Sequence, residues 1–99
     1  MTLGELLQKV KEQNLTKTEL EQYRDELARL FAELQLEMSD LEKDEAIFMS
    51  ERADGETAIS RRITWKATQG GLRLITLKRY ASATKTMMTS LRDRLYNFY

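Results

Sequence analysis

Chemistry in this chain of 99 residues rests on carboxylates, lysines, arginines and hydroxyls, because the sequence contains neither histidine nor cysteine. Without histidine there is no general base that titrates near neutral pH, and the commonest transition-metal ligand is missing. Without cysteine there is no thiolate nucleophile, disulfide or thiolate metal site. These absences exclude Ser/His and Cys/His catalysis. We therefore expect no catalytic residues, no metal site and no cofactor, and the remaining catalytic alternative is an enzyme of carboxylates and lysines.

Carboxylates are densest in the middle of the first half of the chain. They are Glu33, Glu37, Asp40, Glu42, Asp44 and Glu45. On a helix this spacing spreads the acids around the axis, and no histidine accompanies them. We interpret them as a solvated acidic face rather than as a carboxylate metal site.

Charge is sorted along the sequence. Residues 1–50 carry 12 acidic and 6 basic side chains, whereas residues 51–99 carry 4 acidic and 10 basic ones. Such sorting can hold an acidic helix to a basic one, or it can present a basic face to an external polyanion. For the second use we predict phosphate contacts of single-stranded nucleic acid by Arg61, Arg62, Lys66, Arg73, Lys78 and Arg79. The alternative is a solvated, salt-bridged helix surface.

Two helix starts carry the S/T-x-x-E capping box, at Thr2 to Glu5 and at Thr16 to Glu19. They predict a short helix over about 3–13 and a long helix over about 17–53. Both segments repeat apolar residues at steps of three and four, which is typical of one buried helical face.

The Asp54-Gly55 pair predicts the end of the long helix, and Thr57 is a candidate cap for the next one. A third helix is expected over about 57–98, with a kink at 70–71 as an alternative. Its apolar seam keeps an unbroken heptad spacing through Ile63, Ala67, Gly70, Leu74, Leu77, Ala81, Thr84, Met88, Leu91, Leu95 and Phe98. The competing interpretation is a β-hairpin with its loop at Gln69-Gly70-Gly71.

Together these features predict an all-α fold in a single domain. The two long helices should form an antiparallel, coiled-coil-like hairpin, and the short N-terminal helix should cover its open end.

Four residues of the third helix are predicted to mediate protein interaction. Trp65 and Leu72 fall on the side away from the seam, and Gly70 with Gly71 would allow another backbone to approach closely. Because a two-helix layer has no interior of its own, we expect a homo-oligomer, either a dimer or a tetramer.

No apolar run approaches a membrane span, and the N-terminus lacks the apolar core of a signal peptide. We therefore expect a cytoplasmic protein with no membrane partner.

The segment from Glu51 to Ser60 and the ending Met-Met-Thr-Ser-Leu-Arg-Asp-Arg-Leu-Tyr (87–96) resemble small helical-hairpin proteins encoded by bacteriophages. The resemblance covers roughly residues 20–96. It implies a non-enzymatic accessory protein of DNA metabolism in a bacterial host, acting on single-stranded nucleic acid or on a replication or recombination protein. The alternative function is a pure protein-interaction module, a structural adaptor or an inhibitor of a host protein.

Overall fold

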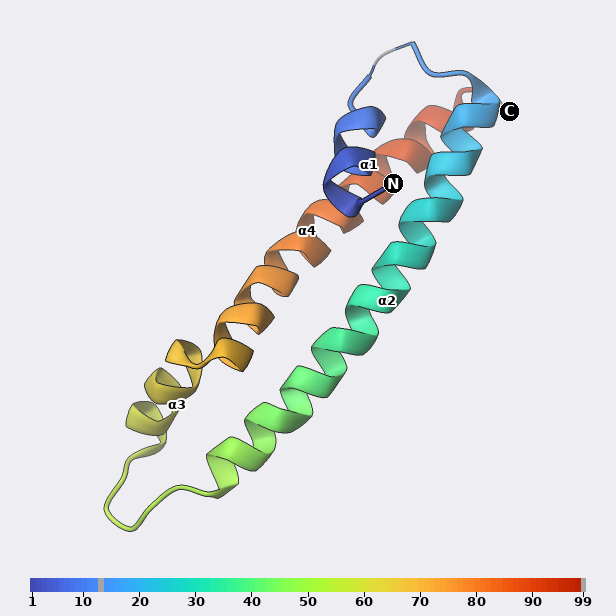
Figure 1. Ribbon diagram of the computed structural model, residues 1–99. Coiled ribbons are helices and arrows are strands. Elements are labelled where there is room, and N and C mark those ends of the chain that lie inside the picture. Colours follow the sequence, from blue (N-terminus) through green and yellow to red (C-terminus); the bar gives the residue numbers. More distant parts are fainter. Residues whose placement is uncertain (13, 99) are drawn as a thin grey trace. The chain divides into compact units, whose positions relative to one another are not determined.

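The computed structural model describes residues 1–12 and 14–98, and these residues form four helices and no strand (Figure 1). The helices are α1 (Leu3–Val10), α2 (Lys17–Ser50), α3 (Ala58–Ala67) and α4 (Gln69–Tyr96). The prediction of an all-α fold is confirmed, and so is the packing of the two long helices against each other. The β-hairpin alternative is wrong, because the segment that would form its two strands belongs to α3 and α4.

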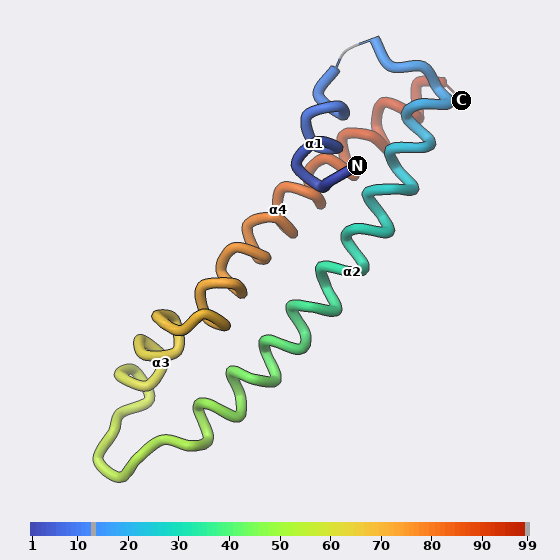
Figure 2. Tube along the Cα trace, in the orientation of Figure 1, coloured from blue at the N-terminus to red at the C-terminus, as the bar shows by residue number. Residues whose placement is uncertain are grey.

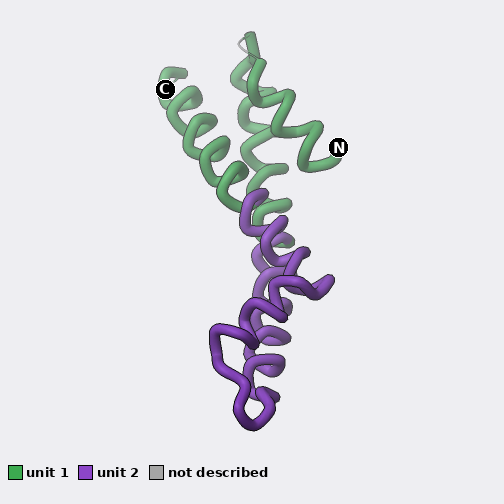
Figure 3. Tube along the Cα trace, turned by 90° about the vertical axis from the view of Figure 1, so that its left-hand side faces the viewer, with its two compact units in different colours: residues 1–33, 81–99 green, residues 34–80 purple. Residues whose placement is uncertain are grey.

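The chain divides into two compact units, and α2 and α4 contribute to both (Figure 3). Unit 1 comprises residues 1–33 and 81–99, and unit 2 comprises residues 34–80. Each unit holds eight acidic and eight basic residues, so each has a formal net charge of zero. In unit 2 five of the eight acids lie on α2 and six of the eight bases on α3 and α4, as expected if charge sorting pairs the helices. In unit 1 five of the eight acids lie on α2, but only three of the eight bases lie on α4.

Side-chain caps fix the first two helix starts. The Thr2 hydroxyl accepts a hydrogen bond from the Glu5 amide at 3.2 Å. At the start of α2 the capping box is complete, since the Glu19 amide donates to Thr16 Oγ1 and the Thr16 amide donates to Glu19 Oε1, both at 3.1 Å. The helix starts predicted from the two sequence motifs are confirmed.

The core of unit 1 is made by α1, the first half of α2 and the last part of α4. Its buried members are Leu6, Val10, Leu15, Leu20, Leu27, Leu91 and Leu95. The predicted apolar stripe of α1 supplies Leu6 and Val10, and the staple residues Leu15 and Leu20 both enter the core. Unit 1 is therefore a three-helix arrangement with an interior.

Unit 2 contains the corner between α2 and α3. Gly55 adopts φ 82°, a conformation that glycine tolerates, and the Thr57 hydroxyl caps α3 by accepting from the Ser60 amide at 3.0 Å. The buried apolar side chains of this unit are Leu34, Trp65, Leu74 and Leu77. This interior is smaller than that of unit 1.

The prediction of a single helix over 57–98 is wrong. The segment forms two helices, α3 and α4, and the helical conformation is interrupted at Thr68 between them (Figure 2). Thr68 has extended backbone angles, φ −74° and ψ 162°. Its hydroxyl donates to the Trp65 carbonyl at 2.6 Å and accepts from the Gly71 amide at 3.0 Å. One side chain thus closes α3 and caps α4, which lets the two helices meet with a single residue between them. The sequence indicated a kink two to three residues later, at Gly70-Gly71.

The interruption also corrects the predicted exposure of two residues. Trp65 was expected on the exposed side of the helix, but it is 6% exposed and lies 5.6 Å from Phe48 between ring centroids. Ile63, the first residue of the predicted seam, is 65% exposed. The extended residue Thr68 resets the helical phase, so α3 does not continue the seam of α4 and turns Trp65 inward instead. Leu72 is exposed, as predicted.

Candidate functional site

Two of the six predicted phosphate contacts are engaged within unit 2. Arg61 Nε donates to the Phe48 carbonyl at 2.9 Å, its guanidinium carbon lies 3.5 Å from the Phe48 ring centroid, and Nε is 3.4 Å from Glu56 Oε1. Phe48 belongs to the last turn of α2, whose carbonyls carry the negative end of the helix dipole. Arg61 therefore caps α2 and is half-buried against it.

Arg73 is the second engaged residue. Its Nε and Nη2 donate to the two carboxylate oxygens of Glu37 at 2.8 and 3.2 Å, a bidentate pair between α4 and α2. These hydrogen bonds lower the pKa of Glu37 from its ordinary 4.5 and raise the pKa of Arg73. Both side chains are half-exposed, so solvent screens the pair, and its main effect is on helix orientation.

The other four predicted contacts, Arg62, Lys66, Lys78 and Arg79, are exposed and make no ion pair within residues 1–12 and 14–98. Arg62 and Lys66 flank two exposed isoleucines on α3, where a shallow hollow of about 300 Å³ is lined by Ala58, Ile59, Arg62, Ile63 and Lys66. Of the predicted nucleic-acid set, these four cations are available to an external partner.

A larger hollow lies in unit 1 between α2 and α4. We call it the basic groove; its volume is about 490 Å³, and it is lined by Arg24, Phe31, Lys85, Met88, Thr89 and Arg92. A second hollow of about 200 Å³, lined by Arg24, Arg92, Leu95 and Tyr96, shares two of these residues. Three cations thus surround an apolar floor that includes an aromatic ring, and no carboxylate is among the lining residues.

Two cations of the basic groove contact aspartates next to them in sequence. Arg24 Nε donates to Asp25 Oδ1 at 3.1 Å, and Arg92 Nη2 is 3.5 Å from Asp93 Oδ1. Both aspartates are strongly exposed, and such pairs contribute little because water competes for both partners. A phosphate or carboxylate entering the groove can replace the contact of Arg92 at small cost.

The opposite side of the same helix pair is covered by α1. There Arg94 reaches across, with Nη1 donating to the Val10 carbonyl at 2.6 Å and Nη2 to the Glu12 carbonyl at 2.7 Å. Met87 and Tyr23 pack against the core of unit 1. The residues that line the basic groove all belong to α2 and α4, and none belongs to α1.

The basic groove was not predicted from the sequence, because the predicted phosphate contacts lie between residues 61 and 79 and the segment that forms α2 is rich in acids. One signal was present: Lys85, Met88 and Arg92 are spaced by three and four residues, so helical periodicity puts them on one face of α4. The contribution of Arg24 from an acidic segment has no comparable signal in the sequence.

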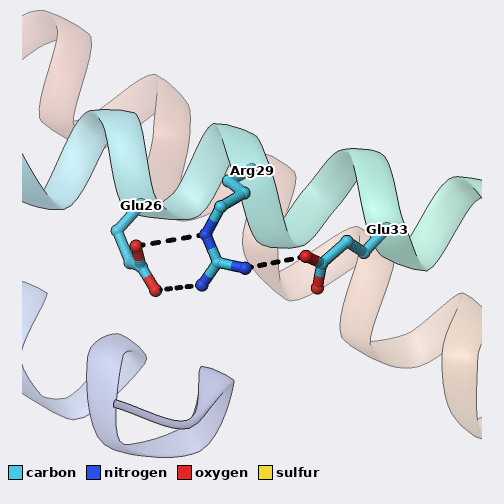
Figure 4. Close-up of polar contacts among 3 residues, drawn as sticks. All are labelled: Glu26, Arg29 and Glu33. Atoms are coloured by element: carbon cyan, nitrogen blue, oxygen red, sulfur yellow. Dashed lines mark hydrogen bonds and ion pairs between the residues drawn. The ribbon is translucent and has the colours of Figure 1, made fainter.

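Two acids of α2 in unit 1, Glu26 and Glu33, form an intrahelical network with Arg29. Arg29 lies between Glu26 and Glu33 and bonds both, with the Glu33 contact at 2.7 Å (Figure 4). The hydrogen bond from Arg29 lowers the pKa of Glu26. Across the described ranges 1–12 and 14–98, no group of three or more carboxylates is placed to hold a metal ion.

Comparison of the chain with protein-family models, with curated proteins and with solved structures finds no match. The resemblance to phage-encoded helical-hairpin proteins therefore stays a prediction. No helix within the described residues combines the length and the apolar character that crossing a membrane requires.

Proposed function

We propose that this protein is a non-enzymatic accessory protein that binds single-stranded nucleic acid in the basic groove of unit 1. In the setting that the sequence resemblance implies, it would act as an oligomer beside phage replication or recombination enzymes. The observation that carries the proposal is the lining of the groove, in which Arg24, Lys85 and Arg92 surround the apolar floor of Phe31 and Met88 without a carboxylate.

The chemistry of this lining matches what single strands require. Proteins that bind them combine cations that follow the phosphates with aromatic faces on which bases stack. In the groove the three cations supply the first element, and Phe31 supplies the second, with Tyr96 exposed at the adjoining hollow. Arginine planes can also stack on bases.

The groove is favoured over the predicted set in unit 2 for a physical reason. Arg61 and Arg73 are engaged by Phe48 and Glu37, so two of those six cations would have to give up internal contacts to reach a phosphate. Trp65 is buried in unit 2, so its ring is not available for stacking on bases.

The test is the salt dependence of binding to a fluorescent single-stranded oligonucleotide at about 50 and 200 mM salt. Three phosphate contacts give a slope of about −2 in log–log form, which is a loss of about 20-fold over that range. The variant Lys85→Gln with Arg92→Gln should reduce the loss to about threefold, because one contact remains.

The matched control is Lys78→Gln with Arg79→Gln, which removes the same charge from exposed positions of α4 in unit 2. It should keep the wild-type slope. If the control loses binding and the groove variant does not, the site lies in unit 2 as the sequence predicted. If the wild-type protein does not bind at low salt, the proposed function is wrong, and an acidic protein segment becomes the ligand to test in the groove.

A further inference from the structure

Unit 2 exposes large aliphatic side chains on two separate helix faces. On α3, Ile59 is 77% exposed and Ile63 is 65% exposed, although both belong to a well-formed helix. With Arg62 and Lys66 they form one continuous surface, which we call the α3 outer face. It is apolar in the middle and positively charged at its sides.

The second face lies on α2. Leu36 is 70% exposed and Ile47 is 56% exposed. Positions 36, 40, 43 and 47 are spaced by four, three and four residues and therefore lie along one side of the helix. Exposed Asp40 and Asp44 accompany the two aliphatic residues, together with Lys43. We call this surface the α2 outer face, and its charge is predominantly negative.

We infer that the occupant of each face is a second copy of this chain, with the α3 outer face of one protomer packed on the α2 outer face of the other. The two faces lie on different helices, each on the side away from the residues that pack inside unit 2, so the contact is heterologous and can repeat from one copy to the next. Each contact would cover two exposed aliphatic residues on either side and bring Arg62 and Lys66 to Asp40 and Asp44.

Charge decides between this arrangement and pairing of like faces. Two α3 outer faces placed together would oppose four cations, and two α2 outer faces would oppose four aspartates with only two lysines. Neither the cations of the α3 outer face nor Asp40 and Asp44 make an ion pair within the described part of the chain. They are therefore available to a partner, and the pairing of unlike faces is the one that brings both sets together.

The length of α3 allows this pairing. The ten residues of α3 make a helix about 15 Å long, which covers the distance of about 16 Å between Leu36 and Ile47 along α2, with Ile59 and Ile63 about 6 Å apart inside that span. Among the described residues, unit 2 also has four buried apolar side chains, against seven in the core of unit 1.

The test is the mass in solution, measured by sedimentation and light scattering over a wide range of protein concentration. We expect the wild-type mass to rise from 11.6 kDa to twice that value and above as the concentration increases. Ile59→Glu with Ile63→Glu should remain at the mass of one chain and keep its helical circular dichroism, because both side chains are exposed. Leu72→Glu, which alters an exposed leucine outside both faces, is the matched control and should associate like the wild type.

A charge exchange makes the test specific for the contact between unlike faces. Variant X carries Arg62→Glu and Lys66→Glu, and variant Y carries Asp40→Lys and Asp44→Lys. Each alone opposes like charges at this contact and should stay monomeric, whereas an equimolar mixture restores opposite charges between X and Y and should associate.

Three results would overturn the inference: a wild-type chain that is monomeric at every concentration, association that survives the two isoleucine substitutions, or an X and Y mixture that does not pair. None of them bears on nucleic-acid binding, which is measured with the groove variants of unit 1. The inference and the proposed function can therefore fail separately.

Discussion

The backbone carbonyl of Trp65 occupies the space where a side chain at position 71 would begin. A Cβ atom built on Gly71 would lie 2.0 Å from the Trp65 oxygen and 2.8 Å from Lys66 Cα. At Gly70 the neighbour is the indole ring itself, with Cη2 at 3.0 Å from such a Cβ and a Leu41 methyl at 3.7 Å. Because both positions lack a side chain, the first turn of α4 can pack directly against the end of α3. This close approach explains why two glycines occur in a helix, where glycine is normally destabilising.

The substitution Gly71→Ala should therefore destabilise the protein strongly. The clash is with backbone atoms that no side-chain rotation can relieve, so we expect a loss of about 3 kcal/mol or more, at or beyond the upper end for overpacked sites. Gly4→Ala is the matched control, because nothing lies within 4 Å of its Cβ position in α1. It should stabilise by about 0.5–1 kcal/mol, and chemical denaturation of both variants checks the pair. A neutral Gly71→Ala would show that α3 and α4 do not meet as described.

Local signals in the sequence were sufficient for the helix starts and for the fold class. Both capping boxes, the Thr57 cap and the apolar stripe of α1 lie where the spacing placed them, because each depends on residues within one or two turns. The break at Thr68 was missed for the opposite reason. The heptad spacing of apolar residues continues on both sides of Thr68, so it predicts one uninterrupted helix. The change in the direction of the side chains between α3 and α4 is visible only in the packing of Trp65 against Gly70 and Gly71.

The candidate site was predicted in part. The sequence shows which residues of the second half are basic, but not that Arg61 donates to a carbonyl or that Arg73 pairs with α2. That distinction depends on which side chains face the neighbouring helix. For the same reason the basic groove, which combines Arg24 of an acidic segment with residues 85–92, follows from packing rather than from composition.

Thr84 gives a prediction of increased stability. It is fully buried in α4, and its hydroxyl has no hydrogen-bond partner within the described residues. Burial of an unpaired hydroxyl costs free energy that a methyl group of similar size does not. Thr84→Val should therefore raise the free energy of unfolding by about 1 kcal/mol. Thr86→Val is the control: its exposed hydroxyl donates to the Ser82 carbonyl, and its loss should have little effect. A destabilised Thr84→Val would mean that the hydroxyl is satisfied.

The pair of Glu37 and Arg73 predicts a pH-dependent contribution to stability. Because hydrogen bonds from Arg73 lower the pKa of Glu37 in the folded state, the contribution is present above the ordinary value of 4.5 and is lost as the pH falls through the lowered pKa. The melting temperature of the wild type should exceed that of Glu37→Gln at pH 7, and the two should converge in acid. Glu42→Gln, which removes an exposed carboxylate outside any ion pair in the described chain, should show no such convergence.

Arg94 predicts that α1 is held by a cap from α4. Its two nitrogens donate to the Val10 and Glu12 carbonyls at the end of α1, where the helix dipole favours a cation. Arg94→Lys keeps the charge but cannot make both bonds from one planar group, so it should recover less than half of the loss caused by Arg94→Ala. We expect Arg94→Ala to cost about 1.5–3 kcal/mol and to speed hydrogen exchange of the α1 amides more than elsewhere in unit 1. Arg92→Lys, at an exposed position on the groove side, is the control and should leave that exchange unchanged. If Arg94→Lys protects α1 as well as arginine does, charge alone holds the helix and the paired hydrogen bonds do not.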